Sequence, residues 1–266
     1  MNDINEQEVI NHGSNQYSLI KILSLWALVA APMGLMRFIL MPWLIEHVNY
    51  NPGLMYWCLM ILGMVWQFVL SVILLKKELG DITWHKLKKR LWINHPIDQK
   101  TMKINKKVYF MTIPVILYAS FWEQFGFFAF IEEWINNMFP VIAPPSYAVI
   151  TNLVSPNLVG AWYVMGIAIV SCIFNYLLGE ELFFRGILLP KMNGVFGRWD
   201  WVFNSILFTT YHIHKISEIP LFLIGSIFIA YLSKKYKSIW PAIIIHGVEG
   251  IPLLVIVYLV VSGLMI

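Results

Sequence analysis

Two adjacent glutamates and an arginine interrupt a long apolar stretch in the second half of the chain. Glu180, Glu181 and Arg185 follow residues 160–178, which contain no charged side chain. Ionisable side chains inside a membrane segment are costly, so where they occur they mark functional sites. Glu181 and Arg185 are four residues apart with the acid first, the better orientation for an ion pair on a helix. We therefore expect Arg185 to neutralise Glu181. Glu180 points about 100° away on the helix, so we expect it to have a different role.

Two histidines in later apolar segments are the expected partners of Glu180. His212 ends the sequence FTTYH, and His246 is the first titratable residue in its segment. Counted from the nearest basic turns at about 1.5 Å per residue, the glutamate and both histidines lie roughly 13–21 Å from one membrane face. His214, about 200° around a helix from His212, is expected to face the outer water.

These residue types predict hydrolysis by an activated water molecule. A carboxylate beside a histidine can take a proton from water and direct the oxygen at a carbonyl carbon. A second histidine across the cavity can donate to the oxyanion that forms. The serines and cysteines of these segments lie two turns or more from Glu180 or His212, so a covalent nucleophile has less support.

A metal site is the alternative reading of the same residues. Two histidines and a glutamate match the ligands of a catalytic zinc ion. The His-Glu-x-x-His spacing that makes such a site predictable is missing from the sequence. We therefore expect no cofactor and catalysis without a metal, with zinc as the less favoured alternative.

The composition indicates an integral membrane protein. Of the 266 residues, 59% are hydrophobic and 13% are charged, against roughly 45–50% and 25% in soluble domains. A helix that spans a bilayer needs about 20 apolar residues. The expected fold is an all-α polytopic membrane bundle of seven or eight transmembrane helices. Its apolar segments are expected at 18–45, 53–75, 108–131, 160–190, 201–214, 219–233 and 238–266.

Basic residues set the expected topology. The loop 76–107 holds ten of the 19 Lys and Arg residues, and the positive-inside rule places such a loop in the cytoplasm. We expect residues 1–17 to form a cytoplasmic N-terminal tail and residues 18–266 to form one membrane-embedded domain. Within that domain, residues 160–255 are the expected catalytic core.

The positions of the basic residues and the cysteines limit the classes of partner that we expect. Basic residues that flank apolar segments orient the protein and contact anionic lipid, so no nucleic acid is expected despite the pI of about 8.9. Cys58 and Cys172 both lie in apolar stretches, which leaves no disulfide framework and no four-cysteine metal site. The expected partners are the lipid bilayer and a peptide or membrane-protein substrate. The oligomeric state is left open.

Three motifs carry a resemblance to a known family. In order and spacing, over about residues 160–255, they are similar to those of the CAAX prenyl protease 2 type, the CPBP family of intramembrane endopeptidases. The motifs are Glu-Glu-x-x-x-Arg at 180–185, Phe-x-x-x-His at 208–212 and the histidine at 246. The resemblance implies an eight-helix membrane fold.

The resemblance also implies roles for single residues. Glu180 and His212 would activate the water. Glu181 and Arg185 would be a supporting pair, and His246 would line the oxyanion side. Gly250 departs from the family, which usually has Asn or Asp there as a second oxyanion group. Losing one oxyanion donor typically costs about 10² to 10³ in rate.

The expected function is an intramembrane endopeptidase, a peptide hydrolase acting on membrane-associated, prenylated or bacteriocin-like peptides. One alternative is a catalytically weak or inactive protein of the same fold that provides bacteriocin immunity or scaffolds a partner. The other alternative is a small transporter in which the buried charges relay a proton or a substrate. The internal repeat that many transporters show is missing from the sequence. The Ile-, Asn- and Lys-rich composition favours a bacterial cytoplasmic membrane.

Overall fold

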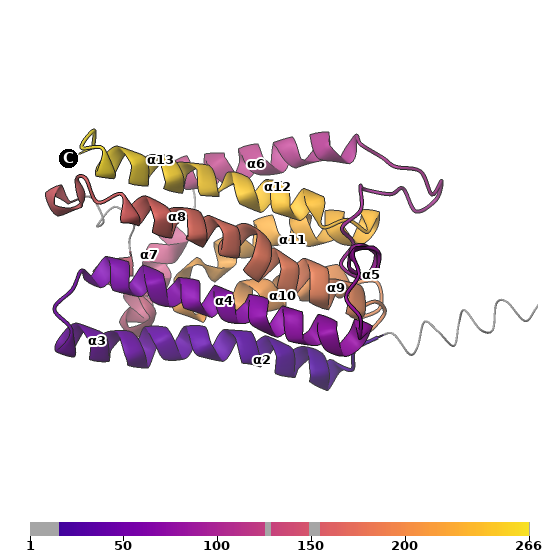
Figure 1. Cartoon of the computed structure of the whole chain (residues 1–266), viewed down its shortest axis with the longest axis horizontal. Helices are drawn as coiled ribbons and strands as arrows, with labels where there is room; N and C mark the ends of the chain where they lie inside the picture. Colours follow the sequence, from indigo (N-terminus) through magenta and orange to yellow (C-terminus); the bar gives the residue numbers. More distant parts are fainter. Residues whose placement is uncertain (1–15, 126–128, 149–154, 266) are drawn as a thin grey trace, which may run out of the picture.

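The long helices of the chain run side by side along one axis (Figure 1). The computed structural model describes residues 16–125, 129–148 and 155–265, and each named element in these ranges is helical. The helix α5 lies at one end of the bundle and the C terminus at the other. The expected tail 1–17 falls almost entirely outside the described residues. The expected all-α class is confirmed for the described part.

The first half of the chain forms a helical hairpin followed by a basic loop. Ser18 caps the first helix by accepting the Lys21 N–H at 3.2 Å, and Asn51 caps the second by accepting the Leu54 N–H at 3.0 Å. Gly80, with φ of 64°, ends the second helix in a conformation that suits glycine. The elements are α2 (Leu19–Leu35), η1 (Met36–Leu40), α3 (Met41–His47), α4 (Pro52–Leu79), α5 (Trp84–Arg90), α6 (Val108–Phe125), α7 (Ala129–Met138), η2 (Pro140–Ile142) and η3 (Ser146–Ala148).

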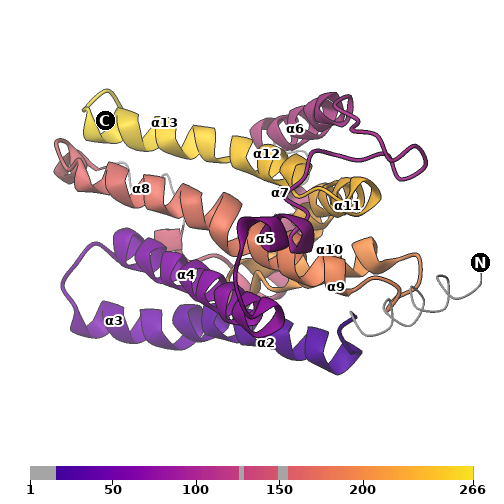
Figure 2. The same cartoon turned by 45° about the vertical axis from the view of Figure 1, so that its right-hand side comes forward.

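The second half contains the helix that carries the acidic motif. This helix is continuous from Tyr163 to Lys191, with two π-helical segments inside it. In the views of Figures 1 and 2, it runs between α4 on one side and α12 and α13 on the other. The elements are η5 (Pro156–Leu158), α8 (Tyr163–Ile173), η6 (Phe174–Gly179), η7 (Leu182–Leu188), α9 (Leu189–Lys191), α10 (Asp200–Thr210), η8 (Ile213–Glu218), α11 (Ile219–Tyr236), α12 (Trp240–Val248) and α13 (Gly250–Val261).

The expected count of seven or eight transmembrane helices is not confirmed. In the described ranges, five helices are long and apolar enough to cross a membrane: Leu19–His47, Pro52–Leu79, Tyr163–Lys191, Ile213–Tyr236 and Trp240–Val261. A sixth, Val108–Tyr118, is apolar but shorter. The chain is therefore an integral membrane protein by the length and composition of its helices. Its division into one domain with a core at 160–255 stays a prediction.

Two expected segments are shorter helices than the hydropathy pattern predicts. The segment 201–214 is not one helix, because α10 ends at Thr210 and a 3-10 turn, η8, follows. The segment 108–131 is divided between α6 and α7. Hydropathy marks apolar residues without marking where the backbone turns, so it joins separate helices into one segment.

The helix with the acidic motif packs closely on α4 at one glycine. A Cβ at Gly179 would lie 2.5 Å from the Phe174 carbonyl oxygen and 3.0 Å from that of Met64. Only glycine allows the two backbones to come this close. The contact seats the glutamates that follow, Glu180 and Glu181, deep in the bundle.

Candidate active site

The two glutamates lie between two π-helical segments. Glu180 and Glu181 separate η6 from η7, and π-helical turns inside α-helices are frequent at functional sites. The wider turns alter the backbone ladder, and side chains from other helices bond to carbonyls of this region. Asn204 donates to the Phe184 carbonyl at 2.9 Å. Arg90, at the end of α5, donates to the carbonyls of Gly186 at 3.0 Å and Ile187 at 3.2 Å. These donors hold the irregular helix in place.

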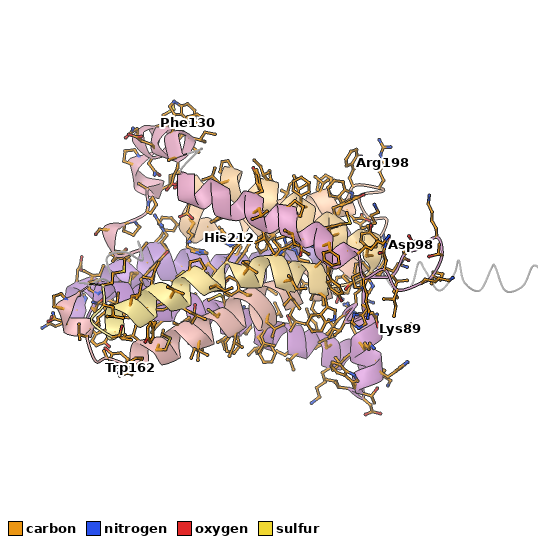
Figure 3. All side chains as sticks on the ribbon, turned by 90° about the horizontal axis from the view of Figure 1, so that it is seen from above. Lys89, Asp98, Phe130, Trp162, Arg198 and His212 are labelled. Carbon is orange, nitrogen blue, oxygen red and sulfur yellow. The ribbon has the colours of Figure 1, made fainter. Side chains whose placement is uncertain are left out.

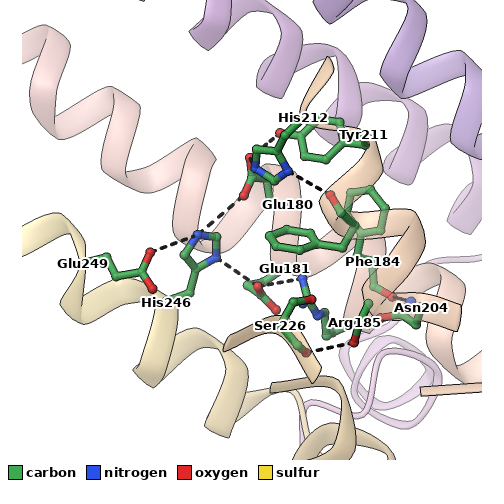
Figure 4. A network of polar contacts seen from close by, with 12 residues as sticks. Glu180, Glu181, Phe184, Arg185, Asn204, Tyr211, His212, Ser226, His246 and Glu249 are labelled. Atoms are coloured by element: carbon green, nitrogen blue, oxygen red, sulfur yellow. Dashed lines mark hydrogen bonds and ion pairs between the residues drawn. The ribbon is translucent and has the colours of Figure 1, made fainter. Parts of the chain in front are cut away.

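Glu181 and Arg185 form the expected ion pair. Nη1 of Arg185 lies 3.1 Å from Oε1 of Glu181, and both side chains are fully buried. Nη2 of Arg185 donates to the Ser226 hydroxyl at 2.9 Å, and the guanidinium carbon lies 3.9 Å from the centre of the Phe208 ring. A buried ion pair needs such added partners to offset the loss of solvation. The pair is therefore a structural anchor that joins three helices (Figure 4).

His212 faces Glu180 with a defined ring nitrogen. Its Nδ1 lies 2.9 Å from the Phe208 carbonyl oxygen, which can only accept, so Nδ1 carries a hydrogen. In the neutral ring, Nε2 then has a free lone pair. This Nε2 lies 3.7 Å from Oε1 of Glu180, which is longer than a direct hydrogen bond. Two proton acceptors thus face each other across a short gap.

His246 lies on the other side of the same carboxylate. Its Nδ1 is 3.0 Å from Oε1 of Glu181, and its Nε2 is 3.6 Å from Oε2 of Glu180. Nε2 is also 3.7 Å from Oε2 of Glu249, three residues along α12. Three carboxylates therefore surround one imidazole. An imidazolium at this position would be stabilised by their charge and could donate from both nitrogens.

These side chains line one cavity. It has a volume of about 760 Å³ and includes Glu180, His212, His246 and Glu249 in its wall. The side chains of Glu180, His212 and His246 are buried, and each has a polar partner inside the bundle. The expected meeting of the three residues is confirmed. Their catalytic roles stay predictions.

His214 does not face the outer water as expected. Its side chain is buried and lines the same cavity, with its ring centre 5.5 Å from that of His212. The helical angle of 200° does not apply, because α10 ends at Thr210 and both histidines lie beyond it. Arg37, buried on η1, donates to the His214 carbonyl and, at 2.7 Å, to that of Ala143. The Arg37 side chain thus holds the backbone of the turn that carries the two histidines.

Sequence reasoning missed two polar residues that contact Glu180. The hydroxyl of Tyr211 donates to Oε1 of Glu180. The side-chain amide of Asn175 lies within 3.2 Å of both oxygens of the same carboxylate. A signal existed for each: Tyr211 directly precedes His212, and Asn175 is a polar residue in an otherwise apolar segment.

The described residues contain no cluster of three or more His, Cys, Asp or Glu side chains with the geometry to hold a metal ion. The two cysteines of the chain, Cys58 and Cys172, are both free. The choice between catalysis with and without zinc stays a prediction for experiment.

The segment that builds this site matches a family model. Residues 161–250 match the family described as type II CAAX prenyl endopeptidase Rce1-like. This segment of the chain is therefore similar to that family. The resemblance drawn from the sequence motifs is thereby confirmed at the level of the family. No curated protein and no solved structure matches the chain.

The Rce1-like segment contains each candidate catalytic residue. Glu180, Glu181, Arg185, His212 and His246 all fall within 161–250, and Gly250 is its last residue. The family is one of proteases, which supports a peptidase for the chain at the family level. The substrate and the activity of this member belong to the proposal that follows.

Proposed function

We propose that the chain is an intramembrane endopeptidase that hydrolyses peptide bonds with a water molecule activated by Glu180 and His212. One observation carries the proposal. Oε1 of Glu180 and Nε2 of His212, both proton acceptors, face each other at 3.7 Å on the wall of a cavity. A water molecule in contact with both can donate one hydrogen to each and keep its lone pairs for attack.

The reaction follows from this placement. The water oxygen bonds to the carbonyl carbon of the peptide, and one water proton passes to the Glu180 and His212 pair. The carbonyl oxygen becomes an oxyanion in a tetrahedral intermediate. When the intermediate collapses, the carbon–nitrogen bond breaks and the proton passes to the leaving nitrogen. One water molecule is consumed, and the products are a carboxylic acid and an amine.

His246 is placed to stabilise the intermediate. As an imidazolium it would donate Nδ1–H to Glu181 and present Nε2–H to the cavity, where the oxyanion forms. Glu181 is in turn fixed by Arg185 at 3.1 Å. The supporting pair therefore sets the orientation of the donor, as partners of a catalytic imidazole commonly do.

The cavity supports a membrane-associated peptide as substrate. Its wall combines the charged residues with apolar side chains such as Met60, Met64, Trp57 and Leu253. The candidate residues lie between the two ends of the bundle, as His212 does in Figure 3, with Lys89 and Arg198 at one end and Trp162 at the other. By the positive-inside rule the basic end faces the cytoplasm. A bacterial cytoplasmic membrane and a cytoplasmic N terminus complete the proposal.

A non-catalytic role is the second candidate, and Gly250 favours it. Glycine at this position brings no side-chain donor to the oxyanion side of the cavity. A protein of this fold with weak or no activity could still protect against a bacteriocin or scaffold a partner. In that case, loss of the Glu180 charge would leave the protection intact.

The test compares matched variants of the purified protein in liposomes. A panel of prenylated and plain peptides is offered, and products are identified by mass spectrometry with and without a chelator. We expect the unchanged protein to cleave a peptide, and Glu180→Gln and His212→Gln to abolish cleavage. The controls Glu46→Gln and His85→Gln replace exposed residues and should behave as the unchanged protein.

The outcomes separate the candidates. Two outcomes contradict the proposed endopeptidase. In one, Glu180→Gln still cleaves the peptide; in the other, only the control variants lose cleavage. Cleavage that the chelator stops and zinc restores would overturn the metal-free form of the reaction. Protection against a bacteriocin that survives Glu180→Gln, with no peptide cleaved by the unchanged protein, would establish the second candidate instead.

A further inference from the structure

Glu180 has hydrogen-bond donors of its own, distinct from the two histidines. The Tyr211 hydroxyl donates to Oε1. The amide nitrogen of Asn175 lies 3.0 Å from Oε1 and 3.2 Å from Oε2. This orientation of the amide is the one that the contacts require, because the carboxylate oxygens accept hydrogen bonds from the nitrogen. Both donors are neutral and neither is part of the water-activating pair.

The two donors come from rigid parts of the bundle. Asn175 is on the π-helical segment η6, five residues before Glu180, a spacing of about one π-helical turn. Tyr211 follows the last residue of α10, and its ring is fully buried. The ring packs against Phe184, with centres 5.2 Å apart, and against Phe208 at 6.1 Å. The Tyr211 ring therefore cannot turn away without disturbing the core.

We propose that Tyr211 and Asn175 are positioning residues that orient the Glu180 carboxylate toward His212 and stabilise its negative charge. The inference rests on the proposed function, because it assigns these residues to the same water-activating step. A carboxylate without donors in a buried site would take up a proton and lose its ability to accept one from water. Donors that bind the charged form prevent this.

Other charged groups also face Glu180 and stay unchanged in the test. Glu181 and Arg185 lie on its own helix, His212 and Lys215 come from the turn after α10, and His246 and Glu249 come from α12. Tyr176 adds a neutral polar group from η6. A change of pH profile in a variant that keeps all of them reports the lost hydrogen bond.

The experiment measures kcat and KM against pH for Tyr211→Phe and Asn175→Leu in liposomes. Each substitution removes the donor and keeps most of the side-chain volume. We expect kcat near neutral pH to fall about 10- to 100-fold, the effect of one charge-assisted hydrogen bond, with KM unchanged. We also expect the acidic limb of the profile to move to higher pH, so that raising the pH restores much of the lost rate. A merely structural role would not produce this rescue.

Matched controls test the specificity of the effect. Tyr258→Phe removes the hydroxyl of an exposed tyrosine on α13, and Asn157→Leu replaces an exposed asparagine on η5. Both should keep the unchanged rate and pH profile. Thermal unfolding of each variant in detergent shows whether the fold is kept. If Tyr211→Phe does not fold, the shift of the acidic limb in Asn175→Leu tests the positioning role by itself.

The failure of this inference differs from that of the proposed function. If Glu180→Gln abolishes cleavage while Tyr211→Phe and Asn175→Leu keep the unchanged rate and pH profile, the positioning role is wrong and the endopeptidase stands. A uniform loss of rate at every pH, with no shift of the acidic limb, also overturns the positioning role. If Glu180→Gln cleaves as well as the unchanged protein, the proposed function itself fails.

Discussion

The ring of Tyr176 occupies the space that a side chain at position 250 would need. A Cβ added to Gly250 would lie 2.6 Å from Cε2 and 3.0 Å from Cδ2 of Tyr176, and 3.2 Å from Sγ of Cys172. The same ring contacts His246 edge-on, with ring centres 4.8 Å apart and planes inclined at 75°. The departure from the family at Gly250 is therefore coupled to the tyrosine that forms this part of the cavity wall.

This relationship predicts a large loss of stability for Gly250→Ala. The added methyl group overpacks the contact with Tyr176, which typically costs about 1–3 kcal/mol. The loss should be smaller in a Tyr176→Ala background, because the ring is no longer there to clash, and a double-mutant cycle of thermal unfolding in detergent measures the difference. Gly247→Ala is the matched control, since a Cβ there meets nothing within 4 Å. Equal effects at Gly250 and Gly247 would contradict the coupling.

The buried ion pair predicts a second stability effect. Arg185→Met removes the cation and leaves Glu181 buried, and breaking such a pair typically costs about 3–5 kcal/mol. The double variant Glu181→Gln and Arg185→Met removes both charges and should be more stable than the single variant. Chemical unfolding followed by tryptophan fluorescence measures both. A single variant as stable as the unchanged protein would show that the pair does not anchor the bundle.

The position of His246 predicts a defect in the chemical step. His246→Gln should lower kcat by about 10² to 10³ and leave KM unchanged, because a transition-state donor is lost while substrate contacts remain. Steady-state kinetics with a cleaved peptide measures the two constants, with His85→Gln as the exposed control. A rise in KM at constant kcat would instead assign His246 to substrate binding.

Arg90 links the basic loop to the helix of the active site. Its Nε lies 2.6 Å from Oε2 of Glu78, and its other nitrogens donate to the Gly186 and Ile187 carbonyls. Arg90→Ala leaves these acceptors without their donor, so we expect a loss of about 1–3 kcal/mol in thermal unfolding. Lys89→Ala removes the same charge from an exposed neighbour on α5 and should have little effect. Equal behaviour of the two variants would show that only net charge matters.

Much of the candidate site was predictable from spacing and hydropathy. The i, i+4 spacing of Glu181 and Arg185 predicted their contact, because both lie on one turn of one helix. Matching depths in the membrane predicted that Glu180, His212 and His246 meet. The error at His214 has a clear cause: the angle was counted along a helix that ends at Thr210.

The sequence by itself determined the membrane class, the apolar segments and the residues whose charge inside them needs a partner. These follow from local properties: hydrophobicity, residue type and spacing along one helix. The tertiary structure alone decided which nitrogen of His212 faces Glu180, that Tyr211 and Asn175 bind the same carboxylate, and that Tyr176 fills the space beside Gly250. Such contacts depend on the packing of different helices and on the irregular π-helical turns, and neither is encoded in a periodic pattern.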